Sequence, residues 1–101
     1  MTNVYLVCNA GMSTGILQMK LEDEAKRLEL DMKVEAIPIT DVKEVEEIAD
    51  VILLGPQIRF AYDDLKSTMP NACVLQITPQ DFGMMNAKVI MKNIIKNIKD
   101  K

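Results

Sequence analysis

Apolar residues recur along this chain in two alternating patterns. Short continuous apolar runs favour buried β-strands, and stretches with apolar residues three or four positions apart favour amphipathic helices. The short runs predict strands at residues 3–8, 33–39, 51–54 and 72–77. The longer spacing predicts helices at residues 13–30, 57–68 and 85–99, a short acidic helix over residues 40–48, and a loop or single turn at residues 78–83.

Each predicted helix has an apolar face that we expect to cover the sheet. The residues predicted to face inward are Leu17, Leu21, Ala25 and Leu28 in the first helix, Val42, Val45 and Ile48 in the acidic helix, Ile58, Ala61, Leu65 and Met69 in the next, and Ala87, Ile90, Met91, Ile94, Ile95 and Ile98 in the last. In the last helix, the lysines at 88, 92, 96 and 99 line the opposite face.

The order of these elements predicts an α/β fold. Strands that alternate with helices of this length are typical of βαβ units and a parallel sheet. The strands are apolar throughout, as expected when helices cover both faces. We therefore predict a three-layer sandwich with a four-stranded parallel sheet in the order 2-1-3-4, and a single domain over residues 1–101.

The composition narrows the classes of function. Hydrophobic residues make up 49% of the 101 residues and charged residues 27%, a balance typical of globular chains. The net charge of −3 has the wrong sign for a general nucleic-acid binder. No apolar run approaches the roughly 20 residues that cross a bilayer, and the N-terminus lacks the features of a secretory signal. The chain is therefore expected not to insert into the membrane. Only two cysteines are present, which is typical of the reducing cytoplasm, so we expect a cytoplasmic protein.

The absence of certain side chains restricts the chemistry further. The sequence contains no histidine, which excludes Ser-His-Asp and Cys-His catalysis, histidine-ligated metals and a phosphohistidine on this chain. We predict neither a metal nor a cofactor. Residues 1–19 contain no Asp, Glu, Lys or Arg. A site in this segment must therefore use backbone dipoles, hydroxyls and a thiol.

The candidate site is the turn between the first strand and the first helix. In a parallel sheet, ligands bind beyond the carboxyl ends of the strands, where the strand order reverses. Here this point lies between the first and third strands. The residues expected there are the nucleophile candidate Cys8, the loop residues Asn9, Ala10, Gly11, Met12, Ser13 and Thr14, and, at a possible edge of the site, Gly55, Pro56 and Gln57.

This turn suits a thiolate and an anion attached to it. The first amides of a helix lack internal partners and carry partial positive charge, which favours the thiolate form of a nearby cysteine. Gly11 lets the backbone approach a ligand closely, and Ser13 and Thr14 offer hydroxyl donors and a helix cap. The alternative is an ordinary turn and cap beside an inert, buried cysteine.

The pattern Cys8-x-x-Gly11-x-Ser13-Thr14 after a short N-terminal strand resembles the lactose/cellobiose-type enzyme IIB of the bacterial sugar phosphotransferase system. Residues 53–58 (Leu-Leu-Gly-Pro-Gln-Ile) and 81–86 (Asp-Phe-Gly-Met-Met-Asn) resemble two further segments of that family. The resemblance implies a phosphotransferase in which Cys8 accepts a phosphoryl group from a phosphohistidine of enzyme IIA. Cys8 would pass it to a disaccharide or oligosaccharide bound to the membrane transporter, enzyme IIC. We expect the chain to be a monomer on its own.

Other families with related turns fit less well. Low-molecular-weight tyrosine phosphatases and related arsenate reductases use Cys-x5-Arg, and Thr14 occupies the position of the arginine that clamps phosphate. This class is the alternative function. A receiver domain needs an aspartate where Leu54 and Gly55 stand, and a thioredoxin-like protein needs a cysteine at position 11. A flavodoxin-like binding module fits the fold alone and gives Cys8 no purpose.

Several roles are left open by the sequence. Cys73 is expected in the core, with a disulfide to Cys8 as the alternative. Arg59 lies either at the edge of the site or in solvent, and Asp81 is either a turn residue or a general acid. Gln57 either caps its helix or contacts the loop. Met12 is either exposed for partners or buried.

Overall fold

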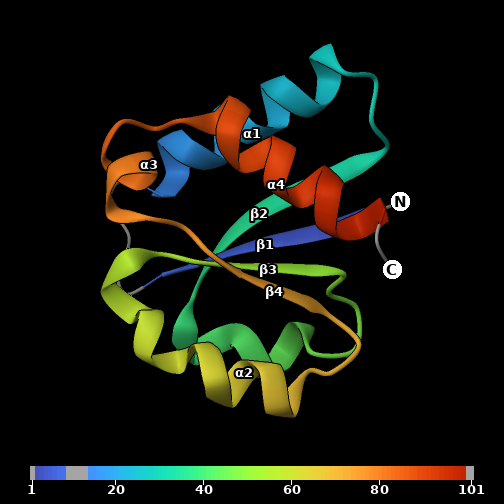
Figure 1. Cartoon of the computed structure of the whole chain (residues 1–101). Coiled ribbons are helices and arrows are strands. Elements are labelled where there is room, and N and C mark those ends of the chain that lie inside the picture. Colours follow the sequence, from blue (N-terminus) through green and yellow to red (C-terminus); the bar gives the residue numbers. More distant parts are fainter. Residues whose placement is uncertain (1, 9–13, 100–101) are drawn as a thin grey trace.

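The computed structural model describes residues 2–8 and 14–99, and its centre is one parallel sheet (Figure 1). The strands are β1 (Thr2–Cys8), β2 (Met32–Pro38), β3 (Val51–Leu54) and β4 (Cys73–Gln76). They pair in the order β2-β1-β3-β4, all in parallel. The predicted sheet and its strand order are confirmed, and the order reverses between β1 and β3.

Helices cover both faces of the sheet, which confirms the three-layer α/β sandwich (Figure 1). One face packs against the long helices α1 (Thr14–Arg27) and α4 (Ala87–Lys99). The other packs against the 3₁₀ helices η1 (Ile39–Val45) and η2 (Pro56–Ala61) and helix α2 (Tyr62–Thr68). A short helix, α3 (Pro79–Gly83), lies between β4 and α4 in the chain and forms the predicted single turn.

The pleat of β1 divides the core into two apolar clusters. Val4 and Leu6 pack toward α1 and α4, whereas Tyr5 and Val7 pack toward η1, η2 and α2. Successive side chains of a strand point to opposite faces, so Cys8 belongs on the side of Val4 and Leu6. The continuous apolar runs are explained by this two-sided burial.

Helix α1 ends earlier than predicted, at Arg27 rather than residue 30. Glu29 takes a left-handed conformation (φ 57°), the Leu30 N–H donates to the Ala25 carbonyl (2.9 Å), and the Glu29 N–H donates to the Lys26 carbonyl (3.1 Å). This is a Schellman motif, in which the residue after the left-handed position packs back on the helix. Leu30 therefore packs against the core, and the prediction that Leu28 faces inward is wrong, since Leu28 is 39% exposed.

The acidic segment forms the 3₁₀ helix η1, and its inward face is shorter than predicted. Val42 is buried and Val45 is half-buried, but Ile48 is 53% exposed. A 3₁₀ helix would keep residues three apart on one face, but η1 ends at Val45. In the turn that follows, Ala49 donates its N–H to the Val45 carbonyl (2.9 Å) and is buried in place of Ile48.

The two later helices begin at different places than predicted. Residues 56–68 form two elements in succession, η2 and α2, and η2 itself is kinked at Ile58, which has non-helical angles (φ −122°, ψ 23°). The last helix begins at Ala87 rather than residue 85, because Met85 is left-handed (φ 52°). The predicted inward residues of both segments are buried or packed against the core: Ile58, Ala61, Leu65, Met69, Ala87, Ile90, Met91, Ile94, Ile95 and Ile98.

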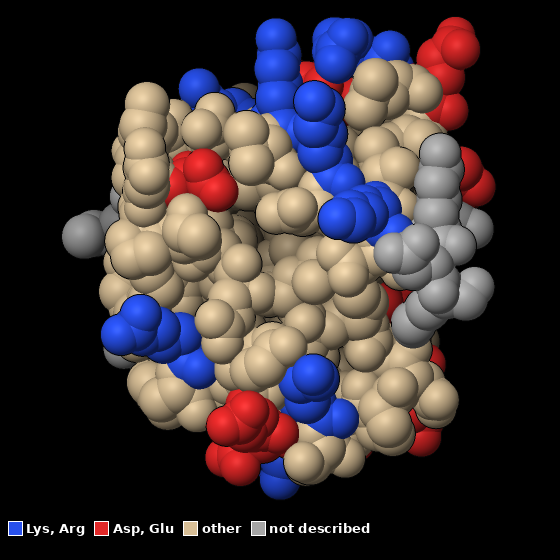
Figure 2. Space-filling model, viewed as in Figure 1, with Lys and Arg blue, Asp and Glu red and all other residues tan. Residues whose placement is uncertain are grey.

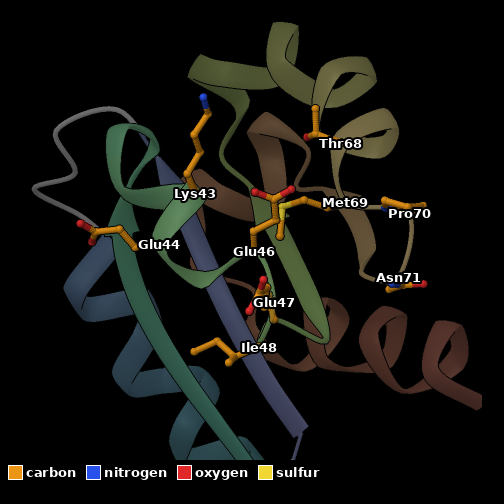
Figure 3. Close-up of a pocket in the computed structure, with 10 residues that line it drawn as sticks. Lys43, Glu44, Glu46, Glu47, Ile48, Thr68, Met69, Pro70 and Asn71 are labelled. Carbon is orange, nitrogen blue, oxygen red and sulfur yellow. The ribbon is translucent and has the colours of Figure 1, made fainter.

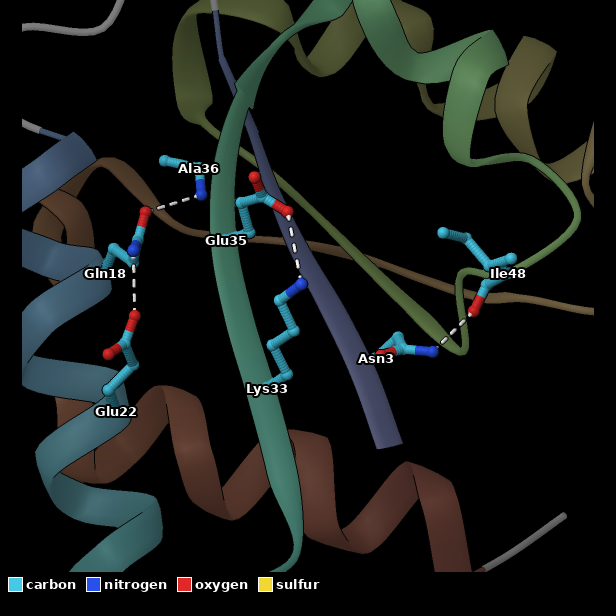
Figure 4. A network of polar contacts seen from close by, with 7 residues as sticks. All are labelled: Asn3, Gln18, Glu22, Lys33, Glu35, Ala36 and Ile48. Carbon is cyan, nitrogen blue, oxygen red and sulfur yellow. Dashed lines mark hydrogen bonds and ion pairs between the residues drawn. The ribbon is translucent and has the colours of Figure 1, made fainter. Parts of the chain in front are cut away.

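A glutamine of α1 covers part of the outer edge of the sheet (Figure 4). β2 is an edge strand, and the Ala36 N–H donates to Gln18 Oε1 (2.7 Å). Gln18 Nε2 in turn donates to Glu22 Oε1 (2.8 Å), one helical turn further along α1. Unpaired edges invite pairing with other chains, so this side chain helps to protect β2.

The charged surface follows the predicted outward face of α4. Lys88, Lys92 and Lys96 are exposed, and basic side chains gather on the α4 side of the molecule (Figure 2). Cations near a helix C-terminus oppose its partial negative charge, which stabilises α4. Within residues 2–8 and 14–99, no helix has the length and apolar character that crossing a bilayer requires.

Candidate functional site

The candidate site lies where β1 and β3 end side by side. Cys8 is the last residue of β1, and Gly55 follows the last residue of β3. The Gly55 N–H donates to the Val7 carbonyl (3.0 Å), which extends the pairing of the two strands to this point. Cys8 is 4% exposed, yet it is a member of neither apolar cluster formed by the described residues.

Gly55 leaves space that the side chain of Cys8 needs. Its backbone is extended (φ −65°, ψ 155°), a conformation open to any residue, so its value is not conformational freedom. A Cβ built on Gly55 would lie 3.3 Å from Cys8 Cβ, 3.2 Å from Gln57 Oε1 and 3.7 Å from Phe82 Cε2. Four residues from three segments of the chain therefore meet at one point.

Gln57 turns its side-chain oxygen back toward this point, although the residue as a whole is exposed. Pro56 begins η2 and directs the chain away from the sheet, a position where the missing N–H of proline does no harm. η2 has no side-chain cap at its N-terminus. Gln57 therefore does not take the capping role, and the predicted contact with the loop involves residues outside the described part of the chain.

Phe82 is at this edge too, and the sequence reasoning missed it. It is 9% exposed and lies on α3, whose start is capped by Thr78: Thr78 Oγ1 accepts a hydrogen bond from the Asp81 N–H (3.1 Å). The Phe82 N–H donates to the Thr78 carbonyl (2.9 Å). The cap in the sequence Thr78-Pro79 could have predicted the helix, but no local pattern shows that its ring reaches the end of β3.

Asp81 and Arg59 do not share this point in the structure. Asp81 Oδ1 accepts a hydrogen bond from Asn86 Nδ2 (3.3 Å), and the Asp81 carbonyl accepts one from the Asn86 N–H (2.9 Å). These bonds favour the turn role for Asp81. Arg59 lies on η2 with an exposed side chain, which fits the solvated role.

Five of the predicted site residues lie outside the described part of the chain. They are Asn9, Ala10, Gly11, Met12 and Ser13. Thr14 is the first residue of α1. The structure therefore shows the two elements that the predicted turn joins, the end of β1 and the start of a helix. A helix start offers backbone amides without intrahelical partners, the groups that an attached phosphate requires.

The second cysteine belongs to a different strand. Cys73 begins β4, is half-buried, and is separated from β1 by β3. No disulfide joins it to Cys8.

Asp50 lies at the amino end of β3, where its Oδ2 accepts the Asn3 N–H (2.7 Å). It is therefore far from the position that a receiver domain requires.

A pocket of about 640 Å³ lies near the amino ends of β3 and β4, at the opposite end of the strands from Cys8 (Figure 3). It is formed by the segments that lead into β3 and β4, and its walls include Lys43, Glu46, Glu47, Met69 and Pro70. Of the predicted site residues that the structure describes, none lines it. Its carboxylates repel anions, so this pocket does not suit a phosphoryl group. Within the described part of the chain, no group of three His, Cys, Asp or Glu residues is arranged to hold a metal.

Comparisons with known proteins agree with this geometry. The family model of the lactose/cellobiose-specific IIB subunit of the phosphotransferase system matches residues 3–93. The chain is 30% identical over 90 residues to the oligo-β-mannoside-specific EIIB component of Bacillus subtilis, covering 87% of both chains. It is also 30% identical over 95 residues to the galactose-specific EIIB component of Lactococcus lactis subsp. cremoris, covering 87% of this chain and 88% of the relative.

Solved structures extend the likeness to the fold. The cellobiose-specific IIB component of Borrelia burgdorferi is 36% identical, with a TM-score of 0.79 over 99% of this chain and 94% of that one. The lactose-specific IIB domain of Streptococcus pneumoniae shares the fold at 13% identity, with a TM-score of 0.84 over 94% and 95% of the two chains. The chain therefore belongs to the lactose/cellobiose-specific IIB family, the sugar-specific phosphotransferase components of the phosphotransferase system.

Proposed function

We propose that Cys8 carries a phosphoryl group between two partner proteins. The group would come from a phosphohistidine of enzyme IIA and pass to a disaccharide or oligosaccharide bound to enzyme IIC. The observation that carries the proposal is the position of Cys8 in a chain of the IIB family. It ends β1 beside Gly55, and five residues separate it from the start of α1.

The transfer consists of two displacements at phosphorus. In the first, the Cys8 thiolate attacks the phosphohistidine, an S–P bond forms, and the P–N bond breaks to release the imidazole of the donor. In the second, a sugar hydroxyl loses its proton and attacks the phosphocysteine. An O–P bond forms, the S–P bond breaks, and the Cys8 thiolate leaves. The histidine belongs to the donor, which fits a chain that contains none.

Backbone amides would hold the phosphocysteine. Residues 1–19 contain no cationic side chain, so the negative charge must meet main-chain donors. The amides of Asn9 to Thr14 and the first turn of α1 are suitable, because oriented N–H groups stabilise a phosphoryl group and the charge that spreads over it during transfer. Gly55, Pro56 and Gln57 would form the opposite edge of the site.

This role also implies a cellular location and two partner proteins. We infer that it acts in the cytoplasm as a monomeric domain over residues 1–101, between a IIA protein and the cytoplasmic side of a IIC transporter. It would need no metal, cofactor or nucleic acid. The EIIB components of Bacillus subtilis and Lactococcus lactis bear the names of different sugars at the same 30% identity. That variety fits a carrier whose membrane partner selects the sugar.

The direct test replaces each cysteine in turn. Cys8→Ser and Cys73→Ser would be incubated with a radiolabelled, phosphorylated enzyme IIA of the lactose/cellobiose class, after circular dichroism has shown both to be folded. Cys8→Ser should accept no label, because its hydroxyl is a far weaker nucleophile than a thiolate. Cys73→Ser should accept label as the wild type does. Undiminished labelling of Cys8→Ser would show that Cys8 is not the acceptor.

A further inference from the structure

A phosphoryl carrier must retain its group until the acceptor arrives, and water competes for the same phosphorus atom. In that side reaction water attacks phosphorus, the S–P bond breaks, the Cys8 thiolate leaves, and inorganic phosphate and a proton are released. Excluding water from the reacting group is a recognised way to suppress it. A carrier of this kind therefore needs an apolar surface beside its cysteine that excludes water.

Phe82 borders the same space beside Gly55 as Cys8 does. Its Cε2 lies 3.7 Å from the point where a Cβ of Gly55 would be, and Cys8 Cβ lies 3.3 Å from the same point. Phe82 is buried with Leu53 and Ile77 in the cluster on the α1 and α4 side of the sheet. Cys8 is on that side by the alternation of β1.

The backbone that carries the ring is hydrogen-bonded on both sides of Phe82. Before it, the Ile77 N–H donates to the Leu54 carbonyl (2.9 Å), which ties the end of β4 to β3. After it, the Met85 N–H donates to the Phe82 carbonyl (3.2 Å), and Asn86 bonds to Asp81 through both its backbone and its side chain. Phe82 thus cannot leave the end of the sheet without breaking these contacts.

We propose that Phe82 is a positioning residue that keeps water away from phosphorylated Cys8 and so sets the lifetime of the phosphocysteine. The proposal rests on the proposed function, because it concerns the phosphorylated form of the same cysteine. The ring of Phe82 donates no hydrogen bond and takes no part in the bonds that form and break. Its effect is on the loss of phosphate to water rather than on acceptance of phosphate from the donor.

The test compares the full-length wild type with Phe82→Leu and Phe82→Ala. Each protein is labelled with radioactive phosphate from a phosphorylated enzyme IIA of the lactose/cellobiose class, the donor is removed, and the release of inorganic phosphate is followed. We expect hydrolysis to be faster by roughly tenfold in Phe82→Ala, and by a smaller factor in Phe82→Leu. Initial acceptance of label should stay within about twofold of the wild type.

The matched control is Met91→Ala, which opens a cavity in the same cluster, on α4. It should lower stability as the Phe82 variants do and leave the lifetime of the label unchanged. If Phe82→Ala does not fold, the lifetime of the label in Phe82→Leu decides the role of Phe82. Wild-type lifetimes in folded Phe82 variants, or an equal loss in Met91→Ala, would overturn the role of Phe82. Failure of the wild type to accept any label would instead overturn the proposed function.

Discussion

Gly55 lies so close to Cys8 that a side chain at this position would crowd the cysteine. Cys8 ends β1 and Gly55 directly follows the neighbouring parallel strand β3, and a methyl group on Gly55 would lie 3.3 Å from Cys8 Cβ. That distance is tighter than ordinary van der Waals contact, and Cys8 Cβ is fixed to a central strand. Since Gly55 has an ordinary extended backbone, close approach to the cysteine explains why a glycine follows β3.

Gly55→Ala should therefore displace Cys8 by a few tenths of an ångström. Misplacement of a reacting group by about 1 Å can lower a rate by about 100-fold, so we expect phosphoryl acceptance from enzyme IIA to fall by about tenfold. Rapid-quench labelling measures this rate. The control is Gly83→Ala, whose new methyl group would meet no atom within 4 Å. Equal rates in the two variants would contradict the steric role of Gly55.

Gln18→Ala should weaken the edge of the sheet. The Ala36 N–H would lose its acceptor, and an unsatisfied backbone group lowers stability by about 1 kcal/mol when it is partly buried. Urea unfolding would measure this loss, and light scattering would report any pairing of exposed β2 edges. Gln80→Ala on α3 replaces an exposed glutamine and should change stability by less than about 0.5 kcal/mol. Equal effects of the two substitutions would contradict the role of Gln18.

Glu24 gives stability a dependence on pH. A hydrogen bond from Arg27 lowers the pKa of the Glu24 carboxyl below its ordinary value of 4.5, and the positive charges of Arg27 and Lys88 act in the same direction. A carboxyl with a lowered pKa in the folded state contributes stability that is fully present above its unfolded pKa. This contribution decreases as the pH falls from about 4.5 through the lowered folded value.

Glu24→Gln should abolish that part of the pH dependence. The difference in urea midpoint between the wild type and Glu24→Gln should be larger at pH 7 than at pH 3. Arg27→Gln removes the partner that donates to Glu24 and should reproduce the same trend. A difference in midpoint that is constant over this pH range would show that the pair does not act through ionisation of Glu24.

The protein should be a poor phosphatase. Thr14 stands where the phosphatase pattern has an arginine, so no guanidinium is available to stabilise transfer of the phosphoryl group to water. We expect no steady hydrolysis of p-nitrophenyl phosphate above the level of Cys8→Ser. Fast, steady hydrolysis by the wild type that is lost in Cys8→Ser would favour the phosphatase alternative.

The sheet could be predicted from sequence because its signal is local and redundant. Each strand is a continuous apolar run, and four such runs separated by amphipathic stretches leave few alternatives to a parallel sheet. The errors occur where one backbone angle decides the outcome. Leu28 points outward because Glu29 adopts a left-handed conformation, which is uncommon outside glycine and asparagine. Ile48 points outward because η1 ends three residues earlier.

The site could be predicted only as far as it is local. Cys8 and Gly55 each end an apolar run, and the strand order brings those ends together. Phe82 comes from a segment 74 residues after Cys8 in the sequence, and only the path of α3 carries its ring to the same point. Contacts of this kind depend on tertiary packing, which neither periodicity nor turn chemistry encodes.

Whether Cys8 carries the phosphoryl group can be read from the mass of one peptide. The wild-type chain would be incubated with a phosphorylated enzyme IIA of the lactose/cellobiose class, digested, and examined by mass spectrometry. We predict that the peptide containing Cys8 gains one phosphoryl group on sulfur and that the peptide containing Cys73 gains none. A phosphoryl group on any other residue, with Cys8 unmodified, would show that Cys8 is not the carrier.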